Sequence, residues 1–149
     1  MTRRSGGYAA AIADVEVNKT TGKVTVQRIT MAHDCGLIVN PDGVKNQVEG
    51  NIVQGVSRAL LEEVTFDAAG VTSLDWSSYP ILKFPDIPEL DIVLVNRQDV
   101  TPLGAGELST VPIPAAIASA IFDAVGIKLR DVPFTPKLVL AALNQTSSS

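Results

Sequence analysis

The segment Gly104-Ala105-Gly106-Glu107 combines two glycines with one acid, shortly before an apolar stretch typical of a helix. Glycine lets a backbone approach a bound group closely, because it has no side chain. A carboxylate placed there can accept a proton if apolar surroundings raise its pKa towards neutrality. The pattern also fits a surface acid in an ordinary strand-to-helix loop, and local spacing leaves both interpretations open. A phosphate-binding loop is disfavoured, since the three-glycine dinucleotide pattern is incomplete and no P-loop lysine follows.

A second candidate is the pair Gln47 and Glu49, within a segment of helical periodicity. On a helical wheel Glu49 falls inside the apolar arc, so its carboxylate should be buried with a partner or face a cavity. Gln47 lies off that arc, on the side of Asn51, Gln54 and Arg58. That side is either a solvated face or a polar surface against a ligand with many hydrogen-bonding edges.

A third candidate is the run His33-Asp34-Cys35. A histidine beside a cysteine could form a nucleophilic pair. Residues two apart on an extended segment share a direction without necessarily touching, and no orienting group is evident beyond Asp34. We therefore favour packing and turn chemistry. A metal site is not expected, because these three residues lack further ligands at helical or zinc-knuckle spacing.

The strands that position these residues can be located from their alternation. Residues 8–17 and 23–31 are rich in β-branched side chains and flank the turn Asn-Lys-Thr-Thr-Gly, which predicts a hairpin with one buried face. A loop is expected from residue 32 to 40. Two short strands are predicted around residues 68–70, and the clearest further strand covers residues 89–97, directly before the glycine segment.

Three helices complete the expected elements. Asn40 can cap a helix from about 41 to 63, with Pro41 at its first position. Isoleucines at every fourth position predict a second helix from about 113 to 125, with Gly126 just past its end. A short helix should start at Thr135-Pro136. The fold class expected is α+β, a hairpin and mixed short strands packed with two main helices and a short C-terminal helix.

Composition narrows the functional classes. The chain has 149 residues, 46% of them hydrophobic and 19% charged, with a net charge of −4. A core of ordinary size is expected, and a sequence-wide basic footprint for nucleic acid is missing. The single cysteine, Cys35, excludes a disulfide within the chain and a cysteine-rich metal site. No apolar run is long enough to span a bilayer, and the N-terminal segment is interpreted as a strand rather than a signal peptide.

Several separated motifs together resemble one family. The stretch HDCGLIVNPDGVKNQVEGNIVQGVSRALLEEVTFD, then SYPILKFPDIPELDIVLVN, GAGE and AAIASAIFDAVGIKLRDVPFTPKLVLAAL, is similar to the C-terminal part of the molybdopterin-binding large subunit of the xanthine dehydrogenase and aldehyde oxidase family. Within that family the likeness is strongest to nicotinate dehydrogenase and isoquinoline oxidoreductase types. It covers nearly the whole chain, in order and with compatible spacing.

The resemblance implies roles for particular residues. It implies that Glu107 lies beside molybdenum and acts as general base in the hydroxylation of an aldehyde or N-heteroaromatic substrate, while Gly104, Ala105 and Gly106 shape the approach to the cofactor. It places Gln47 near the pterin. It also implies that electrons leave through iron–sulfur clusters, which a chain with one cysteine cannot hold and which would belong to a 2Fe–2S partner subunit.

The family's subunit is several times longer, so residues 1–149 are expected to be a C-terminal portion of the cofactor-binding domain, inactive alone, with residues 144–149 as a flexible tail. Partners would be the remainder of the subunit, the 2Fe–2S subunit and a small substrate. The expected location is cytoplasmic, or periplasmic if exported with a partner. The alternative is a non-catalytic assembly module that keeps the fold, holds no cofactor and either docks to a partner subunit or self-associates, since exposed apolar surface would favour oligomers.

Overall fold

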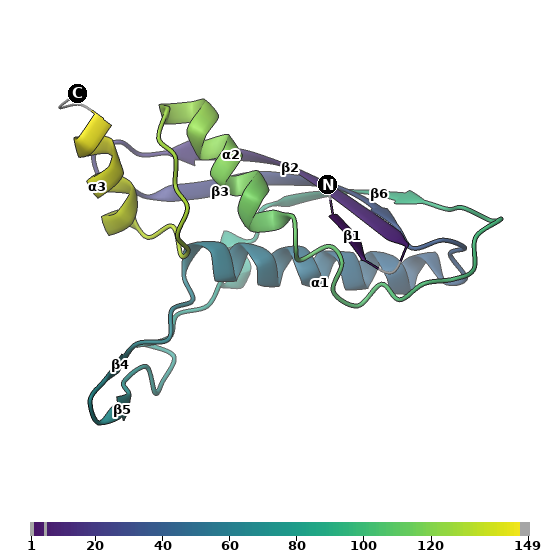
Figure 1. Ribbon diagram of the computed structural model, residues 1–149, viewed down its shortest axis with the longest axis horizontal. Helices are drawn as coiled ribbons and strands as arrows, with labels where there is room; N and C mark the ends of the chain where they lie inside the picture. The colour runs from purple at the N-terminus through teal and green to yellow at the C-terminus, as the bar shows by residue number, and fades with distance from the viewer. Residues whose placement is uncertain (1, 5, 147–149) are drawn as a thin grey trace.

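The two longest strands form the predicted hairpin. The computed structural model describes residues 2–4 and 6–146. Strand β2 (Gly7–Val17) pairs antiparallel with β3 (Val24–Asp34), and the short strand β1 (Thr2–Arg4) pairs with the outer edge of β2 (Figure 1). The turn is closed by Asn18, whose side-chain oxygen accepts hydrogen bonds from the backbone of Thr20 and Thr21. The loop expected from residue 32 begins later, because β3 continues through Asp34.

A bulge in β3 changes which of its side chains face the core. The pairing shifts where Asp14 lies opposite Arg28 while Val15 lies opposite Val26. Before the bulge, Val24 and Val26 face inward, and after it Ile29, Met31 and His33 do. A bulge adds one residue to one strand and so changes the parity of the alternation. As a consequence, His33 is buried instead of facing the opposite side of the sheet.

The fourth strand of the sheet comes from much later in the chain. Strand β6 (Glu89–Val95) pairs parallel with β3, which gives the strand order β1-β2-β3-β6. The parallel register aligns His33 with Leu94 and Asp34 with Val95. The ends of β3 and β6 therefore lie side by side, and the segments that follow them start at the same edge of the sheet.

Helix α1 (Pro41–Leu60) crosses one face of the sheet and contacts both β3 and β6 (Figure 1). Its start is the predicted one, since the Asn40 side chain accepts a hydrogen bond from Gly43 N at 3.0 Å and Pro41 occupies the first turn. Its end comes earlier than residue 63: the backbone N–H of Leu61 closes the last turn on Ser57 O. The polypeptide then leaves the body of the molecule.

Helix α2 (Ile113–Val125) packs on β2 and against α1, so both helices cover the same face of the sheet. It ends as predicted at Gly126, which adopts a left-handed conformation with φ 76°. Gly55 of α1 allows the close contact between the helices: a Cβ there would lie 2.9 Å from Ile113 Cβ. A larger residue at this position would therefore push the two helices apart.

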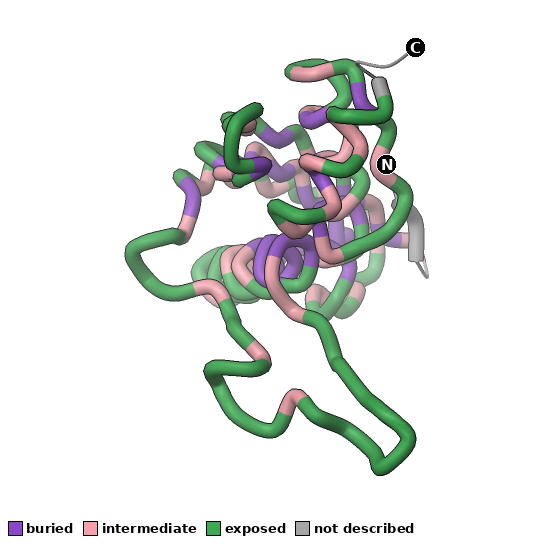
Figure 2. Tube along the Cα trace, turned by 90° about the vertical axis from the view of Figure 1, so that its left-hand side faces the viewer, coloured by how far each residue is buried: buried purple, intermediate pink, exposed green. Residues whose placement is uncertain are grey.

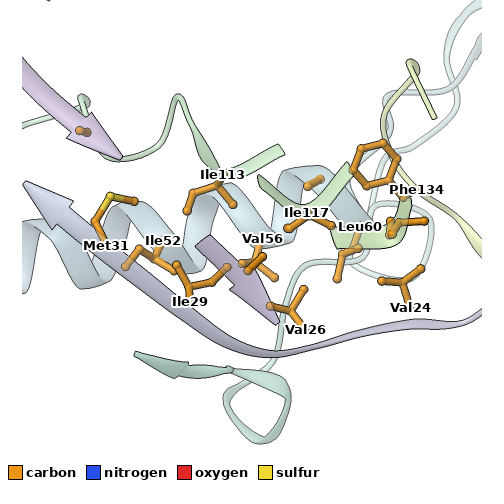
Figure 3. Close-up of a cluster of buried hydrophobic side chains, with 14 of the residues drawn as sticks. Val24, Val26, Ile29, Met31, Ile52, Val56, Leu60, Ile113, Ile117 and Phe134 are labelled. Carbon is orange, nitrogen blue, oxygen red and sulfur yellow. The ribbon is translucent and has the colours of Figure 1, made fainter. Parts of the chain in front are cut away.

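The core lies between the sheet and these helices (Figure 3). Every fourth residue along α1 from Val48 to Leu60 is buried, as are Ile113, Ile117 and Ile121 of α2. They meet the inward side chains of the hairpin, which Figure 3 shows for Val24, Val26, Ile29 and Met31. The expected apolar arcs are thus confirmed, and so is the α+β fold class.

Between α1 and β6 the chain forms an arm that projects from the body (Figure 2). The arm holds the short strands β4 (Phe66–Asp67) and β5 (Gly70–Val71), and it ends in a 3₁₀ turn, η1 (Phe84–Asp86). Several of its large apolar side chains are exposed, among them Phe66 at 78%, Leu74 at 80% and Trp76 at 76%.

Helix α3 (Pro136–Thr146) follows α2 and lies beside the turn of the hairpin (Figure 1). Gly22 in that turn has φ 75° and sits directly against the Pro136 carbonyl. The segment 144–149, expected as a flexible tail, begins inside this helix, and residues 147–149 lie outside the described residues. Over the described ranges, no helix is long and apolar enough to cross a bilayer.

Candidate functional site

The loop between β6 and α2 carries Gly104-Ala105-Gly106-Glu107, and its first half is fixed to the end of β3. Leu103 N donates a hydrogen bond to Cys35 O at 2.8 Å. Gly36, with φ 77°, passes so close that a Cβ on it would lie 2.5 Å from Thr101 O. The parallel pairing of β3 and β6 brings these segments together, although they are far apart in the sequence.

Neither the backbone conformation nor the packing of the described residues requires glycine at positions 104 and 106. Neither Gly104 nor Gly106 has the positive φ that favours glycine, and a Cβ on either would meet no atom of the described residues within 4 Å apart from its immediate neighbours. Both residues are exposed, while Ala105 between them is half-buried. The space beside this backbone is therefore open to a group from outside the described chain.

Glu107 is exposed at the end of this segment, directly before a buried stretch of the loop. Its backbone carbonyl accepts a hydrogen bond from Thr110 N at 3.1 Å, which forms a turn. Leu108 is only 5% exposed and Ser109 is fully buried. The carboxylate-bearing residue thus stands next to a well-anchored backbone.

His33 anchors that backbone from the sheet. Its Nδ1 lies 2.7 Å from Ser109 Oγ, and both side chains are fully buried. Burial lowers the pKa of His33, although the nearby negative charge of Asp34 acts to raise it. Nε2 of His33 is buried without a hydrogen-bond partner among the described residues. The imidazole is therefore a neutral structural group, as the packing interpretation expected.

Cys35 does not form a nucleophilic pair with His33. The thiol is buried, and burial together with the charge of Asp34 raises its pKa.

Asp34 interacts with other residues than His33 and Cys35. Its carboxylate accepts a hydrogen bond from Gly36 N at 3.0 Å and lies 2.7 Å from Arg97 Nε. Burial alone would raise the pKa of Asp34, but these two partners outweigh it and hold that pKa below its usual value.

Asn51 reaches the same loop from α1. It is 8% exposed, its Oδ1 accepts a hydrogen bond from Thr110 Oγ1 at 3.1 Å, and its Nδ2 donates a longer one to Ala105 O at 3.5 Å. The helical wheel placed Asn51 on a solvated or ligand-facing side, and that placement is wrong. The loop covers Asn51 and supplies the polar groups that make burial of its amide tolerable, while Gln47, Gln54 and Arg58 on the same side of the helix stay exposed. The only sequence signal for it was an asparagine directly beside the apolar arc.

Gln47 and Glu49 differ in their surroundings. Gln47 is exposed one helical turn before Asn51, which puts it on the side of α1 that the loop approaches. Glu49 was expected to be buried or to face a cavity, but its side chain is 37% exposed and lies 3.8 Å from Lys45 one turn away. Such exposed pairs contribute little to stability. Across the described ranges, no three His, Cys, Asp or Glu residues gather as metal ligands would.

Comparison with known proteins identifies the family. The sequence model of the molybdopterin cofactor-binding domain matches residues 2–88. The chain belongs to this family, and the predicted relationship to the molybdopterin-binding xanthine dehydrogenase and aldehyde oxidase proteins is confirmed.

Particular relatives agree with this assignment. The chain is 48% identical over 136 residues to a nicotinate dehydrogenase subunit of Pseudomonas putida KT2440, covering 91% of this chain and 12% of that protein. It is 33% identical over 137 residues to the beta subunit of isoquinoline 1-oxidoreductase of Brevundimonas diminuta, covering 92% and 17%. The aldehyde oxidoreductase structure from Desulfovibrio desulfuricans superimposes with a TM-score of 0.82 at 32% identity, covering 91% of this chain and 15% of that one. The chain thus spans less than a fifth of each relative.

Proposed function

We propose that this chain forms one wall of the active site of a molybdenum hydroxylase and supplies Glu107 as the general base. The observation that carries the proposal is the contrast between an open segment and its anchored surroundings. Gly104 and Gly106 face space that the described chain does not fill, while Leu108 and Ser109, directly after Glu107, are buried. A carboxylate presented in this way can meet a group that another part of the protein holds.

The residues present fit a molybdenum–pterin group. An extended, polar cofactor needs backbone without side chains beside it and amides that can donate and accept hydrogen bonds. Gly104 and Gly106, on either side of the half-buried Ala105, offer backbone without side chains, and the exposed side chain of Gln47 on the neighbouring helix offers an amide. Gly50 adds to this fit, because it is exposed inside α1 and a Cβ on it would likewise meet open space.

In the proposed reaction a substrate C–H becomes C–OH with oxygen from water, and two electrons and two protons are released. The cofactor, when bound, supplies the two-electron oxidation. Glu107 takes up the proton from the attacking oxygen, for which a carboxylate within hydrogen-bond reach is sufficient.

The proposal extends to the partners and the location. The remainder of the large subunit would hold most of the cofactor and the substrate pocket, and a 2Fe–2S subunit would take the electrons. The substrate class is an aldehyde or an N-heteroaromatic compound, in line with the names of the related aldehyde, nicotinate and isoquinoline enzymes. The assembled enzyme would work in the cytoplasm, or in the periplasm if exported with a partner.

A second candidate function is a non-catalytic assembly module. The observation that favours it is the projecting arm, where Phe66, Leu74 and Trp76 are largely exposed. Exposed aromatic and aliphatic side chains gathered on one element are typical of an interaction surface.

The experiment that separates the two functions is a metal and turnover measurement. The chain is produced together with the remainder of its subunit and the 2Fe–2S partner, and molybdenum content is measured for wild type and Glu107→Gln. The enzyme function predicts molybdenum in both samples and turnover in wild type alone. A wild-type assembly without molybdenum supports the module instead, and full turnover by Glu107→Gln removes Glu107 as the base.

A further inference from the structure

The two glycines before Glu107 make no side-chain contacts that could fix the conformation of their segment. Gly104 and Gly106 have no side chains, and the backbone around them touches no other described residue where a Cβ would project. Glycine also has more conformational freedom than any other residue. Contacts made by neighbouring residues therefore contribute to the direction in which this segment presents Glu107.

One buried side chain from α1 makes contacts on both sides of Glu107. Asn51 accepts a hydrogen bond from Thr110 Oγ1 at 3.1 Å and donates one to Ala105 O at 3.5 Å. Thr110 in turn donates its backbone N–H to Glu107 O at 3.1 Å. The hydrogen bonds thus connect Ala105 to Asn51, Asn51 to Thr110, and Thr110 to the backbone of Glu107, which lies between Ala105 and Thr110 in the sequence.

The chemistry of the amide suits this position. Ala105 offers a carbonyl, which needs a donor, and the Thr110 hydroxyl here donates, which needs an acceptor. An asparagine provides both from a single short side chain, whereas leucine provides neither. A buried amide without partners would be strongly unfavourable beside Ile52 in the apolar arc, so these two contacts also explain how Asn51 is tolerated there.

We propose that Asn51 is a positioning residue for Glu107, acting through Ala105 and Thr110 to hold the loop in one orientation. This inference rests on the proposed role of Glu107 as the base. Misplacing a catalytic group by about 1 Å can lower a rate by about 100-fold. Loss of the Asn51 contacts should therefore slow the chemical step without removing the cofactor or the substrate.

The test uses the assembled enzyme with two separate variants, Asn51→Leu and Thr110→Val. Each nearly preserves side-chain volume and removes the hydrogen bond between Asn51 and Thr110. We expect kcat to fall about 10- to 100-fold for Asn51→Leu and less for Thr110→Val, with KM and molybdenum content close to wild type. Asn46→Leu is the matched control, because Asn46 is exposed on another side of α1 and should keep wild-type kcat.

A second measurement, independent of activity, is amide hydrogen exchange across residues 104–110 of the assembled enzyme. Exchange there should become faster in Asn51→Leu and Thr110→Val and stay unchanged in Asn46→Leu. Wild-type kcat in both test variants overturns the inference, and so does faster exchange without a loss of kcat. If Asn51→Leu fails to fold, a wild-type rate and exchange in Thr110→Val still overturn it.

A parallel Glu107→Gln sample separates this inference from the proposed function. If Glu107→Gln is inactive while Asn51→Leu and Thr110→Val behave as wild type, only the positioning role of Asn51 is wrong. If Glu107→Gln keeps full turnover, the proposed function itself fails, and the positioning role fails with it.

Discussion

His33 and Ser109 form a buried side-chain hydrogen bond of 2.7 Å that joins the end of β3 to the loop before α2. The two residues are 76 positions apart in the chain. Ser109 lies two residues after Glu107, so this bond fixes the backbone on the far side of the proposed base. It also gives the only histidine of the sequence a structural role.

Removing the hydroxyl of Ser109 should destabilise the fold. In Ser109→Ala the buried Nδ1 of His33 loses its partner, which costs about 1–3 kcal/mol. Urea unfolding of the chain measures this loss. Ser119→Ala is the matched control, because Ser119 is exposed on α2 and its change should stay within about 0.5 kcal/mol. Equal effects of the two substitutions would contradict the assigned contact.

Stability should depend on pH through His33. Its pKa is lowered in the folded state, so below its ordinary value of 6.5 the unfolded chain binds a proton that the folded chain does not. The free energy of unfolding should therefore fall as pH falls below 6.5, by up to about 1.4 kcal/mol per pH unit. Denaturant unfolding between pH 7 and pH 5 measures this slope. His33→Gln should flatten it, and a slope that persists in that variant would assign the effect to another group.

Asp34 should affect the free energy of unfolding in a separate, more acidic pH range. Its pKa is held below the ordinary value of 3.8, so the stability it contributes is present above that value and is lost as pH falls through the folded-state pKa. Asp34→Asn should remove this acid-induced loss without changing the slope near pH 6. An unchanged acid transition in the variant would argue against the Arg97 and Gly36 contacts as its cause.

Elements with local signals could be predicted from the sequence, while the contacts that build the site could not. Asn40 with Pro41 marked the start of α1, and Gly126 marked the end of α2, because capping depends on neighbouring residues. The parallel pairing of β3 with β6 joins segments about 60 residues apart and has no local signal.

Two residues illustrate the limit directly. A bulge near Arg28 turned His33 into the core, although simple alternation from Val24 would have placed it on the other face. On a helical wheel Asn51 lay on a side expected to be solvated or ligand-facing, but it is buried because a loop distant in the sequence covers it. The site residues Glu107 and Gln47 came from family resemblance, since local spacing alone did not separate a base from a surface acid.

The two glycines inside α1 should respond in opposite ways to alanine. Gly55→Ala would place a Cβ 2.9 Å from Ile113 Cβ, and such overpacking costs about 1–3 kcal/mol. Gly50→Ala meets open space and should stabilise the helix by about 1 kcal/mol. Thermal unfolding of the two variants of the chain gives the comparison. Stabilisation by both substitutions would show that the helices do not pack as closely as described.

Gly106→Ala should leave the chain stable but impair the assembled enzyme. The backbone of Gly106 is compatible with alanine and a Cβ meets open space, so the free energy of unfolding should be unchanged or rise by up to about 1 kcal/mol. If the cofactor fills that space, the added methyl group lowers molybdenum content or turnover after assembly. Full molybdenum content and full turnover would show that nothing approaches the loop at this point.

The most direct measurement is the single-turnover rate of the assembled enzyme with Glu107→Gln, compared with wild type and with Glu63→Gln. Glu63 is an exposed acid just past the end of α1, so its substitution makes the same chemical change away from the loop. Loss of a general base predicts a rate about 10²–10⁴-fold below wild type for Glu107→Gln, with molybdenum content and substrate affinity retained, and a wild-type rate for Glu63→Gln. A Glu107→Gln enzyme that turns over as fast as the Glu63→Gln control would contradict the account.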